Sequence, residues 1–270
     1  MQCIVSIACG DTALHGMLYR PTEPLGRTLV LCDPFAEEKK CAHRPLVDLS
    51  RALCAAGYEV LRFDYYGCGN SPGRFGDAGP ARWLDDIRAA LGYARQELGA
   101  AWLGLAGLRV GAALADAIAA ADTAPLECLI LLEPVIDGKR TIAQNLRRSM
   151  VKAMLTDGEQ FRAEDVSRRH ASDVVDFDGY EVSAACREAL EALYMPAAPQ
   201  NVACPCYVLN IGTKDEPAEP YVRLAEAYPR GTAEGVRLEP FWTRIGLMDA
   251  GPVIDKTLHW LQESCGDRGG

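Results

Sequence analysis

Apolar runs alternate with amphipathic segments along most of the chain. Thr28–Cys32 is continuously apolar and Leu126–Leu132 nearly so, which is typical of strands buried on both faces of a sheet. Arg44–Ala56 instead places apolar residues at helical spacing and is followed by Gly57, which can end a helix. The same patterns predict further strands at Ile4–Ala8, Leu14–Tyr19, Tyr58–Asp64, Trp102–Ala106, Tyr207–Ile211 and Val236–Phe241, and further helices at Leu84–Leu98, Ala112–Ala121 and Val253–Gln262.

Repeated alternation of strand and helix predicts an α/β fold with a doubly wound, mostly parallel sheet. A charged, helical stretch at 137–196 interrupts the rhythm between two core strands. We interpret it as an inserted helical lid over the carboxyl edge of the sheet, where α/β proteins place ligands. A peripheral helical decoration is the alternative. The predicted core is therefore 1–136 and 197–264, and 265–270 is a flexible tail.

Charge and hydropathy narrow the function classes. The 270 residues carry a net charge of −9, so there is no overall basic field to attract nucleic acid. No apolar run is long enough to span a membrane, and the first residues do not resemble a signal peptide. We therefore expect a cytoplasmic protein with a small-molecule ligand, no nucleic-acid partner and no membrane span; a homodimer is left open.

The eleven cysteines are scattered and contain no CxxC pair. Zinc sites usually need two such pairs, or histidines at matching spacing, so we predict no metal and no cofactor. Without a secretory signal, reduced and mostly buried thiols are expected. The four histidines carry more information, because hydrolytic mechanisms need an imidazole at a particular place.

The segment Leu103–Ala112 is the most informative part of the chain. It consists of an apolar strand, a Gly107-Leu-Arg-Val-Gly111 turn and an alanine-rich helix, the setting of a nucleophile elbow. Arg109 stands where the nucleophile belongs, and a guanidinium is always protonated and does not attack.

Two interpretations of Arg109 remain open. At a helix N-terminus it would clamp an anionic group of a ligand or partner. Alternatively, it pairs inside the protein with Glu37, Glu38 or Asp215 and fills a vacated catalytic site.

Four segments make the chain resemble a known superfamily. They are Pro34-Phe-Ala-Glu-Glu38, Gly107-Leu-Arg-Val-Gly-Ala112, Gly179-Tyr-Glu-Val-Ser183 and Pro240-Phe-Trp242. With them, the chain resembles the α/β-hydrolases along nearly its full length, and more narrowly the exosortase A system-associated hydrolases of type 2. It departs from that pattern after Glu38, where Lys39-Lys40-Cys41 stands in place of Met-Asn-Lys.

The resemblance implies an α/β-hydrolase fold and assigns candidate roles. The backbone amides of Val110 and of the Phe35–Ala36 loop would form the oxyanion hole, with Glu37, Glu38 and Trp242 nearby in the substrate site. Asp215, in Asn210-Ile-Gly-Thr-Lys-Asp215, stands at the position of the triad acid; the alternative is a solvated turn residue. The loop that should carry the base, Phe241–Gly246, contains no histidine.

No other residue is a strong candidate to replace the missing nucleophile or the missing base. Cys32 ends its strand beside Asp33, where Arg109 would lower its pKa, and Cys68 lies on the following loop; ordinary packing is the alternative for both. Among the histidines, His43 borders the predicted cleft most closely, whereas His15, His170 and His259 fall in a strand, the lid and the last helix.

Two function classes follow. The first is an acyl or ester hydrolase with non-standard chemistry, acting on an acidic or acylated small substrate, with Arg109 as anion binder and Asp215, at the position of the triad acid, as the candidate base. The second is a pseudo-hydrolase that binds a ligand or a partner without turnover. Loss of both serine and histidine should remove most of the acceleration that a triad supplies, because these residues act as a unit.

Overall fold

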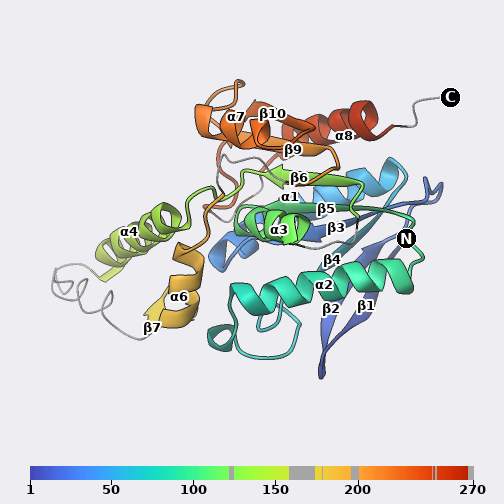
Figure 1. Cartoon of the computed structure of the whole chain (residues 1–270). Helices are drawn as coiled ribbons and strands as arrows, with labels where there is room; N and C mark the ends of the chain where they lie inside the picture. The colour runs from blue at the N-terminus through green and yellow to red at the C-terminus, as the bar shows by residue number, and fades with distance from the viewer. Residues whose placement is uncertain are drawn as a thin grey trace.

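An eight-stranded sheet forms the centre of the molecule, in the order β1-β2-β4-β3-β5-β6-β9-β10 (Figure 1). The computed structural model describes residues 1–121, 125–157, 174–177, 179–195, 201–244, 246 and 248–266. The strands of this sheet are β1 (Gln2–Cys9), β2 (Thr12–Tyr19), β3 (Arg27–Cys32), β4 (Tyr58–Phe63), β5 (Trp102–Leu108), β6 (Cys128–Leu132), β9 (Cys206–Gly212) and β10 (Gly231–Arg237). β2 pairs antiparallel with β1 and with β4, and all the other pairs are parallel. This is the α/β-hydrolase fold that the sequence predicts.

Helices cover both faces of the sheet, as the buried strands require. They are α1 (Glu37–Ala55), α2 (Pro80–Gln96), α3 (Val110–Ala121), α7 (Glu219–Glu226) and α8 (Gly251–Cys265), with a short 3-10 turn at Phe75–Asp77. One apolar core lies between the sheet and α2, α3 and α7, and a second lies between the sheet and α1 and α8. The alternation of side chains along each strand supplies both cores.

The two largest errors in the predicted boundaries concern the first helix and the last strand. The first helix begins at Glu37, not at Arg44, and it accommodates Pro45 in its interior. The last strand is Gly231–Arg237, not Val236–Phe241. It is an edge strand with only two buried residues, so the apolar pattern is weak there, whereas Phe241 is buried in the following turn.

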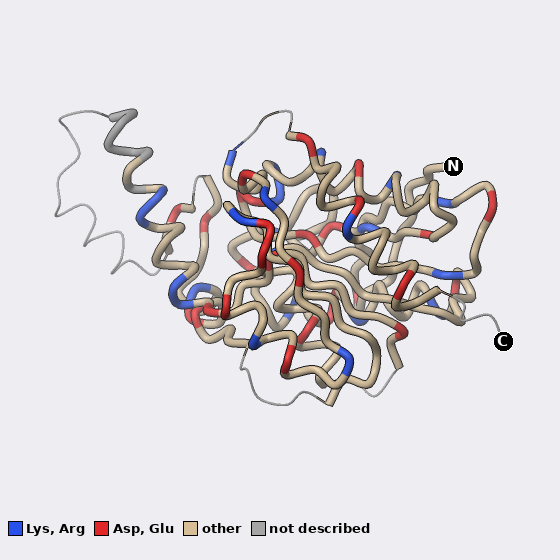
Figure 2. Tube along the Cα trace, turned by 90° about the horizontal axis from the view of Figure 1, so that it is seen from above, with Lys and Arg blue, Asp and Glu red and all other residues tan. Residues whose placement is uncertain are grey.

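The interrupting segment holds α4 (Gly138–Asp157), a two-stranded sheet of β7 (Val174–Asp176) and β8 (Glu181–Ser183), and α6 (Ala184–Glu191). Figure 1 shows α4 and α6 beyond one end of the main sheet. Lysines and arginines are interspersed with acidic residues over the described trace (Figure 2). None of the helices within the described residues is long and apolar enough to cross a membrane.

Candidate functional site at the strand-to-helix elbow

Arg109 is the single residue that joins β5 to α3, and its backbone is left-handed, with φ of 58°. The two glycines that flank it are required by close packing. A Cβ on Gly107 would lie 2.4 Å from the carbonyl oxygen of Gly111, and a Cβ on Gly111 would lie 2.4 Å from that of Asp33. The sharp turn predicted from the sequence therefore has a direct steric basis.

Backbone strain gathers at this edge of the sheet. Within the described residues, the non-glycine residues with positive φ are Ala36, Arg109 and Glu133. They follow β3, β5 and β6, three strands that are neighbours in the sheet. Each such conformation costs about 1 kcal/mol or more, and clusters of them are typical of functional sites.

The guanidinium of Arg109 is held by groups of the protein itself. Its Nε and Nη2 each lie 3.4 Å from a carboxylate oxygen of Glu38, and its plane lies over Trp242, 5.2 Å from the ring centroid. The side chain of Glu38 is 3% exposed and that of Arg109 13%. Burial alone would lower the pKa of Arg109, but Glu38 and then Glu133 outweigh it and raise the pKa.

Glu133 is the residue of this site that the sequence reasoning missed. One carboxylate oxygen accepts hydrogen bonds from Asn210 Nδ2 at 2.8 Å and from the Ile211 amide at 2.6 Å, and the other accepts from the Tyr221 hydroxyl at 2.6 Å. Burial and the charge of Glu133 raise the pKa of Tyr221. A carboxylate directly after the strand predicted at Leu126–Leu132, at the edge where ligands bind, was the signal available in the sequence.

Asp215, the predicted triad acid, faces solvent. Its side chain is 63% exposed, accepts a hydrogen bond from the Arg237 amide at 3.1 Å and pairs with the Arg237 guanidinium at 3.5 Å. These contacts with Arg237 are those of a solvated turn residue. Glu133, not Asp215, is the second carboxylate that raises the pKa of Arg109.

The predicted oxyanion segments converge at the elbow, and the described residues leave small cavities beside them. Val110 begins α3, and Ala36 precedes α1 with φ of 51°. Two cavities of about 10 Å³ each adjoin them, one lined by Glu37 and Glu38 and the other by Val110. Such a volume holds about one water molecule.

Aromatic side chains and the inserted segment fill the surroundings. Phe35 packs against Phe75, Trp83 and Phe177, with ring centroids 5.6 to 5.9 Å apart. Asn145 and Arg148 of α4 line the small cavity beside Glu37 together with Phe177. The described part of the cleft is therefore closely packed.

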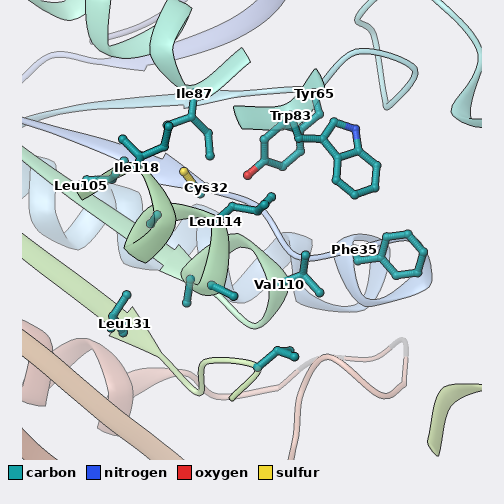
Figure 3. Close-up of a cluster of buried hydrophobic side chains, with 14 of the residues drawn as sticks. Cys32, Phe35, Tyr65, Trp83, Ile87, Leu105, Val110, Leu114, Ile118 and Leu131 are labelled. Carbon is teal, nitrogen blue, oxygen red and sulfur yellow. The ribbon is translucent and has the colours of Figure 1, made fainter. Parts of the chain in front are cut away.

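Cys32 is not poised as a nucleophile. Its side chain is fully buried, and Figure 3 shows its sulfur among Tyr65, Leu114 and Ile118, on the side of the sheet that α2 and α3 cover. Burial raises its pKa to about 12, so the lowering expected from Arg109 is wrong. Burial raises the pKa of Cys68 to about 12 as well.

The histidines lie away from the elbow where the structure describes them. His15 pairs with Asp64 at 3.4 Å, His43 is exposed on α1, and His259 is exposed on α8 beside Glu263. His170 falls outside the described residues. Within those residues, no group of three or more histidine, cysteine or acidic side chains could hold a metal ion.

Comparison with known proteins gives one family match. Residues 29–183, more than half of the chain, match the model of the family described as serine aminopeptidase, S33. No curated protein is significantly similar to the chain.

Many solved structures share the fold. Est1E from Butyrivibrio proteoclasticus with bound ferulic acid has a TM-score of 0.75 at 19% identity, covering 97% of this chain and 100% of that one. An esterase of Pyrococcus furiosus has a TM-score of 0.63 at 15% identity, covering 98% and 91%. Proline iminopeptidase of Mycobacterium smegmatis has a TM-score of 0.61 at 17% identity, covering 97% and 98%. At these identities the likeness is one of fold.

Proposed function

The chain belongs to the serine aminopeptidase S33 family. Within this family, we propose that it is a member that does not hydrolyse substrates and that instead binds a ligand or partner on the hydrolase scaffold. One observation carries the proposal. The residue at the nucleophile position is an arginine whose charge is already paired, inside the protein, with the buried carboxylate of Glu38.

The chemistry of the elbow supports a binding role. Acyl transfer on this scaffold needs a nucleophile, a base oriented by a carboxylate, and amides aimed at an oxyanion. Arg109 cannot supply the first, and the sequence between Val236 and Leu258 contains no histidine to supply the second. A site that keeps only its amides loses several orders of magnitude in rate.

The enzyme alternative is an acyl or ester hydrolase with non-standard chemistry. The family name and the esterases among the structural neighbours favour it. It requires Arg109 to leave Glu38 and clamp an acidic or acylated substrate, with Asp215 or Glu133 as the acid. The cavities of about 10 Å³ beside the elbow favour the non-hydrolysing protein instead, because a substrate needs a pocket of several hundred Å³.

We also propose that the chain is a relative of the exosortase A system-associated hydrolases. The four segments that carry this resemblance meet in space. Glu38 pairs with Arg109, and Arg109 lies over Trp242. Lys40, next to the first segment, lies over the ring of Tyr180 at 4.8 Å. If the four segments form one site, the site as a whole would be the feature that this chain has in common with those hydrolases.

The division into a core at 1–136 and 197–264 and a lid at 137–196 is part of the proposal. The place of α4 and α6 beyond the end of the sheet supports a cover over the elbow (Figure 1). So does the contribution of Asn145 and Arg148 to the cavity beside Glu37.

The test is turnover of short- and medium-chain activated esters and thioesters by the purified chain, with Arg109→Ala and Arg109→Ser prepared in parallel. We expect rates equal to those of buffer for all three proteins. Arg109→Ser restores a hydroxyl but no imidazole, so it stays inactive. Turnover that Arg109→Ala abolishes, while far-UV circular dichroism shows an intact fold, would contradict the proposal and support the enzyme alternative.

A further inference from the structure

A hollow of about 430 Å³ lies between α1 and the strands β2 and β4, on the α1 side of the sheet, and shares only Asp33 with the elbow cavities described above. Its helical wall is a stripe at every fourth residue of α1: Lys39, His43, Val47 and Arg51. Its strand wall follows the period of two, with His15, Met17 and Tyr19 from β2, and Arg62 from β4 continued by Asp64. Regular elements therefore build this hollow from both sides.

Alternating charges run through the polar end of the hollow. Arg62 Nη2 lies 3.0 Å from Asp33, and Lys39 Nζ lies 2.6 Å from both Asp33 and Asp64. His15 Nδ1 completes the row, 3.4 Å from Asp64. The side chains of Asp33 and Arg62 are 2% and 9% exposed.

Such a row costs the fold free energy, because desolvation of buried ions is seldom fully offset by their attraction. Apolar residues at positions 62 and 39 would cover the sheet without this desolvation cost. Val60, two residues before Arg62 on the same face of the strand, does so. The elbow chemistry uses none of Lys39, Arg62 and Asp64. Charged groups retained at this cost, beside an open hollow, point to a binding site.

The balance of charge and apolar wall defines the ligand. The charges of Lys39 and Arg62 are balanced by the carboxylates of Asp33 and Asp64. Arg51, at the other end of the hollow, is about half exposed and lies 3.8 Å from Asp48, which is longer than a hydrogen bond, so its guanidinium is the cation of the hollow that can meet the anion of a ligand. Lys39 donates to two carboxylates and has a third N–H to offer. Between the charged end and Arg51, the side chains of Met17 and Val47 present apolar surface.

We propose that this hollow binds a small organic monocarboxylate, with its carboxylate at Arg51 and its apolar body along Val47 and Met17. A second hollow of about 360 Å³ shares Gln2, Tyr19 and Arg51 with the first, so a longer ligand has room to extend past Arg51. The site lies outside the elbow, so it stands whether or not the elbow hydrolyses esters.

The histidines provide the readout. His43 and His15 line the hollow, whereas His259 lies exposed on α8 and serves as an internal control. We titrate the intact protein with hexanoate and follow imidazole signals by NMR, with hexanamide as the uncharged probe and inorganic phosphate as an anion without an apolar body. We expect the imidazole signals of His43 and His15 to shift saturably with hexanoate and the signal of His259 to stay unchanged. Hexanamide and phosphate should bind at least fivefold more weakly, which corresponds to the loss of about one half-exposed ion pair.

The chain offers a matched pair of variants for the same titration. Arg51 and Arg44 are both about half exposed on α1 and both lie near Asp48, but only Arg51 lines the hollow. Arg51→Gln should weaken hexanoate binding about fivefold and Arg44→Gln should leave it unchanged. Val47→Trp fills the hollow and should abolish binding.

Several results would overturn the proposal: no saturable shift of His43 or His15, hexanamide binding as tightly as hexanoate, equal effects of the two arginine variants, or full binding in Val47→Trp.

Discussion

Arg109 combines three unusual properties at one position. Its backbone is left-handed, its side chain is almost buried, and it stands where this scaffold presents a nucleophile. The Nε and Nη2 distances of 3.4 Å to Glu38 are longer than those of a tight charge-assisted pair. The ring of Trp242 lies against the guanidinium, and the charge of Glu133 adds to that of Glu38 in raising the pKa of Arg109. The residue is therefore best understood as an internal cation that closes the elbow.

Asp33 gives the buried charge row a measurable pH dependence. Burial alone would raise its pKa, but Lys39 and Arg62 outweigh burial and lower the pKa from 3.8 to about 2. Because the folded-state pKa is depressed, the stabilisation is complete above pH 4 and is lost as the pH falls toward 2. This group should contribute about 2 kcal/mol to the loss of unfolding free energy in that range.

The matching measurement is urea unfolding at pH 4, 3 and 2 for wild type, Asp33→Asn and Asp85→Asn. Asp85 is 66% exposed on α2 and serves as the control. Asp33→Asn should be less stable at pH 4 and lose less stability on acidification, whereas Asp85→Asn should follow wild type. Parallel curves for all three would show that Asp33 carries no such linkage.

At the scale of elements, the elbow depends on two glycines that bring α3 against β3 and β5. Gly111→Ala should destabilise the protein by about 2 kcal/mol or more, because the new Cβ meets the backbone carbonyls of Asp33 and Cys32 at 2.4 and 2.5 Å. Gly92→Ala is the matched control, since it lies inside α2 with nothing within 4 Å of its Cβ position. It should stabilise by about 0.5 to 1 kcal/mol. Thermal unfolding of both variants decides the point, and a neutral Gly111→Ala would contradict the steric account.

The elements themselves were largely predictable, because buried parallel strands have a strong apolar signature. Thr28–Cys32 and Leu126–Leu132 were found within a residue or two. The first turn of α1 was missed because Glu37–Lys40 are all charged: Glu37 and Glu38 line an elbow cavity and Lys39 lines the hollow, so helical apolar spacing begins only later. β10 was misplaced because an edge strand needs few apolar residues.

At the scale of the whole molecule, the fold was predictable and the pairing within the site was not. The turn glycines marked Arg109, and the sequence offered Glu37, Glu38 and Asp215 as its partners. To identify Glu38 as the partner of Arg109, one must know how α1 lies relative to the elbow, because the two residues are 71 positions apart in sequence. Glu133 and the charge row at Lys39 depend on the same kind of long-range placement, and no local pattern encodes it.

The central claim is that Arg109 is neutralised inside the protein by Glu38 and is not held ready for substrate. A double-mutant cycle with Arg109→Met, Glu38→Gln and the double variant, measured by urea unfolding at pH 7, tests it most directly. We predict that each single variant loses about 2 to 3 kcal/mol, because it leaves its partner buried and unpaired, and that the double variant loses little more than one of them. The resulting coupling is about 2 kcal/mol. Additive losses, with a coupling near zero, would contradict the claim and leave Arg109 free to bind an anion.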